Sequence, residues 1–128
     1  MRKITLMILL AVVSNSAMAD WANVARNENT AIYVDQDSVE KTGDMAKMWH
    51  LTDYNNSHKD MGEAYLSMKD QNEYDCKEMK FRRRASSQHS KNMGGGKVVY
   101  SDTFITKWKP VQPDSGTEIL WKFACLKR

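Results

Sequence analysis

The chain has 128 residues, of which 41% are hydrophobic and 27% are charged, and its formal net charge at pH 7 is +3. This length suits one domain with a modest hydrophobic core. Two of the 19 cations lie in the first three residues, which leaves 17 cations against 16 acids in residues 20–128. So small an excess gives no reason to expect a general attraction to nucleic acid or to an anionic membrane.

The first residues have the layout of a secretory signal peptide. Arg2 and Lys3 precede an apolar run over Ile4–Val13, and residues 17–19 (Ala-Met-Ala) form a small-x-small cleavage pattern. We expect residues 1–19 to be a signal peptide and residues 20–128 to be a single mature domain. A membrane anchor is the alternative, but a spanning helix needs about 20 apolar residues and this run has roughly half that number.

The residue after the expected cleavage site argues against a lipid anchor. A bacterial lipoprotein needs a cysteine at that position, whereas this chain has Asp20. No later stretch is apolar enough to span a bilayer. The sequence therefore predicts an exported protein that is not a lipoprotein and that is periplasmic, secreted or displayed on the cell surface.

The mature chain shows a series of strand patterns separated by turns. The expected strands cover residues 21–26, 31–35, 45–54, 64–69, 76–87 and 97–106. Residues 37–41 could form a helical turn or a tight loop, residues 55–60 a loop, and the glycines at 94–96 a hairpin turn. Pro110 and Pro113 discourage further sheet or helix.

The end of the chain has a helical pattern. Ser115 and Glu118 have the spacing of a capping box, and Lys127 and Arg128 suit the negative end of a helix dipole. The apolar residues that follow the cap recur at helical spacing: Ile119, Phe123 and Leu126. We therefore predict an α+β domain, in which an antiparallel β-sheet of about five to six strands packs against one C-terminal helix.

Cys76 and Cys125 are the only cysteines of the chain. In an exported protein they are expected to form a disulfide, which would close a loop of about 50 residues and stabilise the fold by about 4 kcal/mol. A metal pair and a reactive thiol are the alternatives, but no histidine lies at ligand spacing. Because Cys125 is on the helix and Cys76 at the head of an expected strand, the bridge would tie the helix to the sheet.

The sequence contains no recognisable enzyme active site. His50, His58 and His89 lie outside any nucleophile motif and outside any standard metal-ligand spacing, so we expect no enzyme, no metal and no cofactor. Methionines could form a copper site, but core filling explains them more simply. The four tryptophans could form a ligand cage or anchor the core, and we favour core anchors with one or two exposed: Trp21, Trp49, Trp108 and Trp121.

The densest cluster of charge lies on one expected strand. Lys80, Arg82 and Arg84 share a face there, while Lys77 and Arg83 point to the other face. The cluster could bind acidic proteins or sulfated glycans. The interpretation we favour is a solvated outer strand face whose charges also oppose edge-to-edge aggregation. We take Lys80, Arg82 and Arg84 as the candidate partner-binding residues.

Short motifs spread in order over the mature chain resemble those of the surface-adhesin protein E family of Gram-negative bacteria. They are Tyr33-Val34-Asp35, Trp49, Asp53-Tyr54, Tyr65-Leu66-Ser67, Tyr74-Asp75-Cys76, Gly96-Lys97-Val98-Val99, Trp108-Lys109-Pro110-Val111, Leu120-Trp121 and Ala124-Cys125. The resemblance implies an antiparallel sheet with a helix tied back by a disulfide. It also implies a non-enzymatic protein that forms a homodimer and binds host proteins such as vitronectin, laminin and plasminogen.

Three hypotheses of function follow. The first is an exported binding domain that acts as an adhesin when displayed on the cell surface. The second is a periplasmic housekeeping or stress protein of the cell envelope with an unknown partner, which Asp20 favours because it removes the lipid anchor. The third and weakest is an envelope enzyme or hydrolase inhibitor, which would need a deep pocket around His50 or His89 with convergent carboxylates.

Overall fold

The computed structural model describes residues 20–60 and 62–126. The predicted signal peptide and the two terminal cations lie outside these residues. The strands are β1 (Trp21–Arg26), β2 (Thr30–Asp35), β3 (Glu40–Thr42), β4 (Met45–His58), β5 (Tyr65–Asp75), β6 (Lys80–His89), β7 (Val98–Asp102) and β8 (Lys109–Pro110). The helices are the short 3-10 turns η1 (Gln36–Ser38) and η2 (Asn92–Gly94) and the α-helix α2 (Gly116–Leu126).

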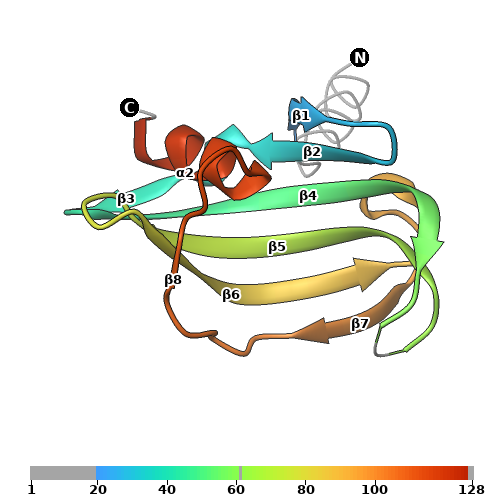
Figure 1. Ribbon diagram of the computed structural model, residues 1–128. Coiled ribbons are helices and arrows are strands. Elements are labelled where there is room, and N and C mark those ends of the chain that lie inside the picture. Colours follow the sequence, from blue (N-terminus) through green and yellow to red (C-terminus); the bar gives the residue numbers. More distant parts are fainter. Residues whose placement is uncertain (1–19, 61, 127–128) are drawn as a thin grey trace, which may run out of the picture.

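All eight strands belong to one antiparallel sheet. Six strands follow one another in the order β1-β2-β4-β5-β6-β7, while β3 pairs with β4 and β8 pairs with β6. Figure 1 shows the long strands β4, β5 and β6 curving side by side, with α2 lying across one side of the sheet. The predicted α+β class is confirmed, and the C-terminal segment returns over the sheet as expected.

The hydrophobic core lies between α2 and the sheet. Alternate residues of each strand point to the same face, so Ala46 and Met48 of β4 both point towards the helix. The core consists of fully or nearly fully buried residues from β2, β4, β5 and α2: Val34, Ala46, Met48, Tyr74, Leu120, Ala124 and Cys125. Burial of these apolar side chains is what holds the helix on the sheet.

A disulfide and two hydrogen bonds attach α2 to the strands. The predicted Cys76–Cys125 disulfide is present, with the two Cα atoms 5.6 Å apart. The indole N–H of Trp121 donates to the carbonyl oxygen of Asp75 at 3.0 Å. On β3, the ammonium of Lys41 donates to the carbonyl oxygen of Cys125 at 2.7 Å. That contact places a cation at the negative end of the helix dipole, the role that the sequence suggested for the two terminal cations.

The N-terminal cap of α2 has the predicted form with one difference. The backbone N–H of Glu118 donates to Ser115 Oγ at 3.1 Å, as in a capping box. The carboxylate of Glu118 then accepts from the backbone N–H of Asp114 at 3.1 Å, one residue earlier than in the standard motif. The first contact satisfies a backbone N–H that the first turn of a helix leaves free, and the second fixes the residue before the cap.

The predicted strand count was too low, because the sheet has eight strands and not five to six. The two additional strands, β3 and β8, have only three and two residues and so carry no alternating pattern of their own. The sequence analysis expected Pro110 to discourage sheet structure, yet Pro110 is part of β8. It is tolerated because β8 pairs with β6 on one side only, and an edge strand can spare the missing N–H.

Several predicted boundaries were also wrong. Cys76 does not head a strand but lies in the turn after β5, and β6 begins at Lys80. The turn forms because Asp75 Oδ1 accepts from the backbone N–H groups of Lys77 and Glu78, at 3.0 and 2.9 Å. Likewise, β4 extends through the polar residues 55–58, and β5 continues to Asp75, because pairing with neighbouring strands overrides weak local patterns.

Candidate functional site

The face of the sheet opposite α2, here called the helix-free face, carries most of the charged side chains of the long strands. Residues that lie directly opposite in neighbouring strands point to the same face. Lys47, Glu73 and Arg82 form one such row across β4, β5 and β6. The next row consists of Trp49, Gln71 and Ala85. The turn η2 packs on the same face further along, where the backbone N–H of Gly94 donates to Ser67 Oγ.

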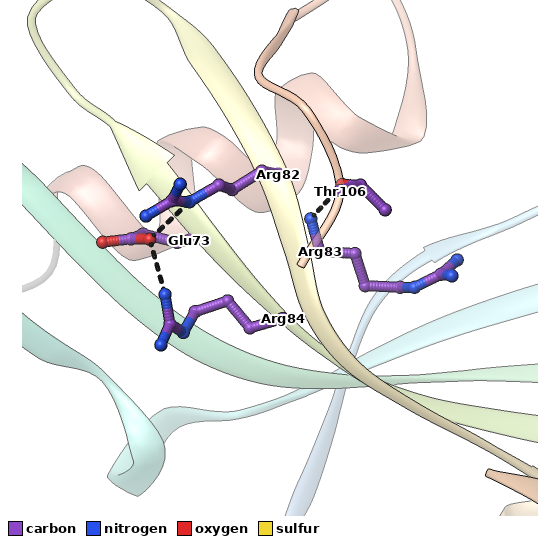
Figure 2. Close-up of polar contacts among 5 residues, drawn as sticks. All are labelled: Glu73, Arg82, Arg83, Arg84 and Thr106. Atoms are coloured by element: carbon purple, nitrogen blue, oxygen red, sulfur yellow. Dashed lines mark hydrogen bonds and ion pairs between the residues drawn. The ribbon is translucent and has the colours of Figure 1, made fainter. Parts of the chain in front are cut away.

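The predicted basic cluster lies on this face, but an acid that the sequence analysis did not single out partly neutralises it. Arg82 Nε donates to Glu73 Oε1 at 2.8 Å, and Arg84 Nη1 donates to the same oxygen at 3.2 Å. Figure 2 shows Arg82 and Arg84 reaching Glu73 from β6, while Arg83 points the other way, as predicted. Lys80, at the start of β6, is exposed.

A β-bulge explains how two arginines reach one carboxylate. Gln71 pairs with Ala85 and Asn72 pairs with Arg83, so Arg84 is an extra residue in β6. A bulge bends its strand and redirects the side chain of the extra residue. The result is a shared ion pair of two cations and one acid, which retains one positive charge.

The segment between β7 and β8 runs along the outer edge of β6 and adds an aromatic ring to the cluster. The guanidinium of Arg82 lies over the ring of Trp108, 4.4 Å from its centroid. Thr106 fixes this segment: its N–H donates to the Arg83 carbonyl at 3.0 Å, and its Oγ1 accepts from the Arg83 N–H at 2.9 Å (Figure 2). Arg82 is therefore held on two sides, by a carboxylate and by an aromatic face.

A shallow groove of about 440 Å³ lies beside the basic cluster on the helix-free face. Trp49 contributes to its lining from the second row. The rest of the lining comes from β6, β7 and the residue after β7: Ala85, Ser86, Ser87, Ser101, Asp102 and Thr103. The groove thus combines an aromatic ring with hydroxyl groups, next to a row that contains two cations.

The tryptophans divide between the two faces. Trp121 packs against the core on the helix side. Trp21 precedes Ala22, which packs on the core, so the Trp21 side chain points to the helix-free face. Trp49 and Trp108 are half-buried on or beside the helix-free face. The four rings do not form one cage, because Trp121 lies on the opposite side of the sheet from Trp49 and Trp108.

The three histidines lie apart from one another. His50 is buried on the helix side, and its Nε2 lies 3.8 Å from Asp70 Oδ2. His89 is buried at the end of β6, where its Nε2 lies 2.8 Å from Ser87 Oγ. His58 is exposed and packs against Tyr54, with ring centroids 4.0 Å apart. Within residues 20–60 and 62–126, no three His, Cys, Asp or Glu side chains are grouped to hold a metal ion.

Burial changes the proton affinity of two of these histidines. Desolvation lowers the pKa of His50, and the nearby Asp70 carboxylate opposes only part of that effect. Desolvation also lowers the pKa of His89, and the ammonium of Lys69 lowers it further. Both imidazoles are therefore held neutral over a wider pH range than a free histidine.

We expect these two histidines to make the fold less stable in mild acid. Unfolded histidine titrates near pH 6.5, so below that pH the unfolded chain binds more protons than the folded one. The free energy of unfolding should therefore fall as the pH drops from 7.5 to 5.5, as measured by urea denaturation. His50→Gln should flatten this dependence, whereas the exposed control His58→Gln should retain it; equal slopes in both variants would contradict the prediction.

The sequence analysis found the cations of the site but missed Glu73 and Trp108 as their partners. Glu73 lies on β5 and Trp108 in the segment before β8, and only the register of the sheet shows that they meet β6. A weak signal was available, because Glu73 and Arg82 lie at similar distances from the turn at Cys76–Met79.

Comparisons with known proteins agree with this architecture. Residues 21–126 match the family described as Surface-adhesin protein E. A search of curated proteins found no match, and among the described residues no helix has the length and apolar character needed to cross a membrane.

Solved structures of protein E from Haemophilus influenzae have a similar fold. One crystal form aligns with a TM-score of 0.64 at 11% identity, over 83% of this chain and 87% of that chain. A structure from a non-typeable strain aligns with a TM-score of 0.62 at 12% identity, over 83% of this chain and 75% of that chain. The identities are low, so these structures support the fold alone. The family match covers residues 21–126 of the 128, and this protein therefore belongs to the surface-adhesin protein E family.

Proposed function

We propose that the protein is an exported, non-enzymatic binding protein that adheres to host matrix or plasma proteins through its helix-free face. The proposal includes removal of residues 1–19 on export. Family membership supports adhesion as the role, and vitronectin, laminin and plasminogen are the partners that the family resemblance suggests. The observation that carries the proposal is the cation-rich face of β6, where Lys80, Arg82 and Arg84 lie together beside Trp108.

This arrangement suits an acidic protein surface. Arginine and aromatic residues dominate the binding energy of many protein interfaces. Here the ion pair with Glu73 and the contact with Trp108 hold Arg82 in one orientation, so less side-chain entropy is lost on binding. Because two arginines share one carboxylate, the cluster keeps a net positive charge that can attract acidic partners from a distance.

Replacing the basic cluster should weaken binding to host proteins. We expect Lys80→Gln, Arg82→Gln and Arg84→Gln combined to lower affinity for immobilised vitronectin or laminin by about tenfold or more. Surface plasmon resonance at two salt concentrations would measure this loss. If the site is electrostatic, binding by the triple variant should also depend less on salt than binding by the wild type. A matched control replaces three exposed cations elsewhere, Arg26, Lys59 and Lys122, by glutamine; an equal loss in that control would refute the proposed site.

Replacing Glu73 alone should strengthen the attraction of the cluster for acidic host proteins. Glu73→Gln removes the carboxylate that neutralises Arg82 and Arg84, so the cluster gains positive charge. We expect faster association with acidic host proteins and a steeper salt dependence, both seen in the same experiment. Slower association would contradict an electrostatic role for this face.

A second candidate function rests on the residue at the expected cleavage site. Asp20 cannot accept a lipid, so a periplasmic envelope protein with a partner inside the cell envelope is the alternative. Cell fractionation separates the two proposals. Protein found only in the periplasm would rule out adhesion, and protein accessible to antibodies on intact cells would support it.

A further inference from the structure

The groove beside the basic cluster has the features of a carbohydrate site. Its volume of about 440 Å³ is in the range of small-molecule sites, and it is open on the surface of the helix-free face. Trp49 is half-buried there, with its backbone N–H fixed by Ser38 Oγ at 2.9 Å. A half-buried indole offers a flat apolar face to a ligand, and its place in the middle of the long strand β4 makes that face rigid.

Hydroxyl groups line the opposite wall. Ser101 and Thr103 are exposed on and after the edge strand β7, and neither side chain makes a hydrogen bond to another of the described residues. Ser87 lies directly opposite Ser101, and its hydroxyl is within 2.8 Å of His89 Nε2. An aromatic face on one side and free hydroxyl donors and acceptors on the other match a sugar ring, which has apolar faces and polar edges.

A cationic row flanks the groove on one side, and one acid contributes to its lining. This row contains Lys47 and Arg82 with a single acid, Glu73. Lys69 lies in the row of Ser87, but its side chain packs beside Gly94 and does not line the groove. The lining contains one acid, Asp102, whose carboxylate accepts from the Tyr100 hydroxyl at 2.7 Å and from the backbone N–H of Phe104 at 3.1 Å. A ligand that lies in the groove would therefore meet Lys47 and Arg82 along one of its long sides.

We propose that this groove binds an acidic oligosaccharide, with Trp49 stacking on a sugar ring and the flanking cations contacting its sulfate or carboxylate groups. The proposal deepens the proposed function, on which it rests, because it assigns a ligand class to the same face. It requires no covalent step and no cofactor. An acidic peptide would satisfy the cations but would leave the flat indole and the row of hydroxyls without a matching surface.

Calorimetric titration of the purified protein with a heparin-derived hexasaccharide tests the inference. We expect binding by the wild type, no binding of the neutral maltohexaose, and affinity at least about tenfold lower for Trp49→Ala. Because Trp49→Ala removes a large half-buried side chain, a second variant is needed. Ser101→Asp places an anion at an exposed rim position and should also weaken binding about tenfold.

The matched control is Ser57→Asp, which makes the same charge change at an exposed position of β4 outside the groove. The inference would be overturned if Ser101→Asp and Ser57→Asp weakened binding of the hexasaccharide equally. It would also be overturned if a polyglutamate peptide bound with the same affinity as the hexasaccharide and lost the same affinity in Trp49→Ala. If the wild type binds vitronectin or laminin but not the hexasaccharide, the groove inference fails while the proposed function stands. Binding of the hexasaccharide without binding of any host protein would support the groove inference and contradict the proposed function.

Discussion

Replacing both cysteines by alanine should lower the free energy of unfolding by about 4 kcal/mol. The Cys76–Cys125 bridge closes a loop of 49 residues in the unfolded chain, and a cross-link of that length removes much conformational entropy from the unfolded state. The bridge also joins the turn after β5 to the last turn of α2, two segments that otherwise meet through a small number of core residues. Urea denaturation of the wild type and of the double variant measures the difference.

The double variant is preferred because a single change would leave a reactive thiol. Wild type unfolded in the presence of a reductant serves as a control, and it should resemble the double variant. A loss below about 1 kcal/mol, outside the usual range of 2–5 kcal/mol for native disulfides, would show that packing alone holds the helix.

Truncation of one core residue of α2 should have an effect of similar size. Leu120 is 3% exposed and packs on the residues of β2, β4 and β5 that form the core. We expect Leu120→Ala to destabilise the fold by about 2–5 kcal/mol, since it removes buried apolar contacts and leaves a cavity.

The same helix provides a matched control. Leu126 is 70% exposed, and Leu126→Ala makes the identical chemical change outside the core. It should alter stability by less than about 0.5 kcal/mol. Equal effects of the two substitutions in thermal or urea unfolding would show that α2 is not held through Leu120.

The parts of the fold that were predicted correctly have local signals in the sequence. The alternation of Trp49 and Leu51 with His50 indicates a strand whatever its neighbours in the sheet. The spacing of Ser115 and Glu118 indicates the start of a helix. The two shortest strands could not be predicted, because their residues become strands only through pairing with β4 and β6.

The candidate site could likewise be predicted only in part. That Lys80, Arg82 and Arg84 share a face follows from the period of a strand, and in the structure Arg82 and Arg84 both reach Glu73 (Figure 2). Their partners could not be predicted, because the contact with Glu73 depends on the register of β5 with β6 and on the bulge at Arg84. The groove at Trp49 depends in addition on the register of β7 with β6, which shifts between Gln88 and His89 and has no signal in the sequence.

The outer boundary of the sheet has a consequence for self-association. A long, straight edge strand exposes a row of unpaired N–H and C=O groups to which another chain can add. Here three separate pieces cover β6: strand β7, the contact of Thr106 with Arg83, and strand β8 with its proline. None of these pieces is longer than five residues, and Pro110 has no N–H to offer. The molecule should therefore resist polymerisation into fibrils along this side, even at high protein concentration.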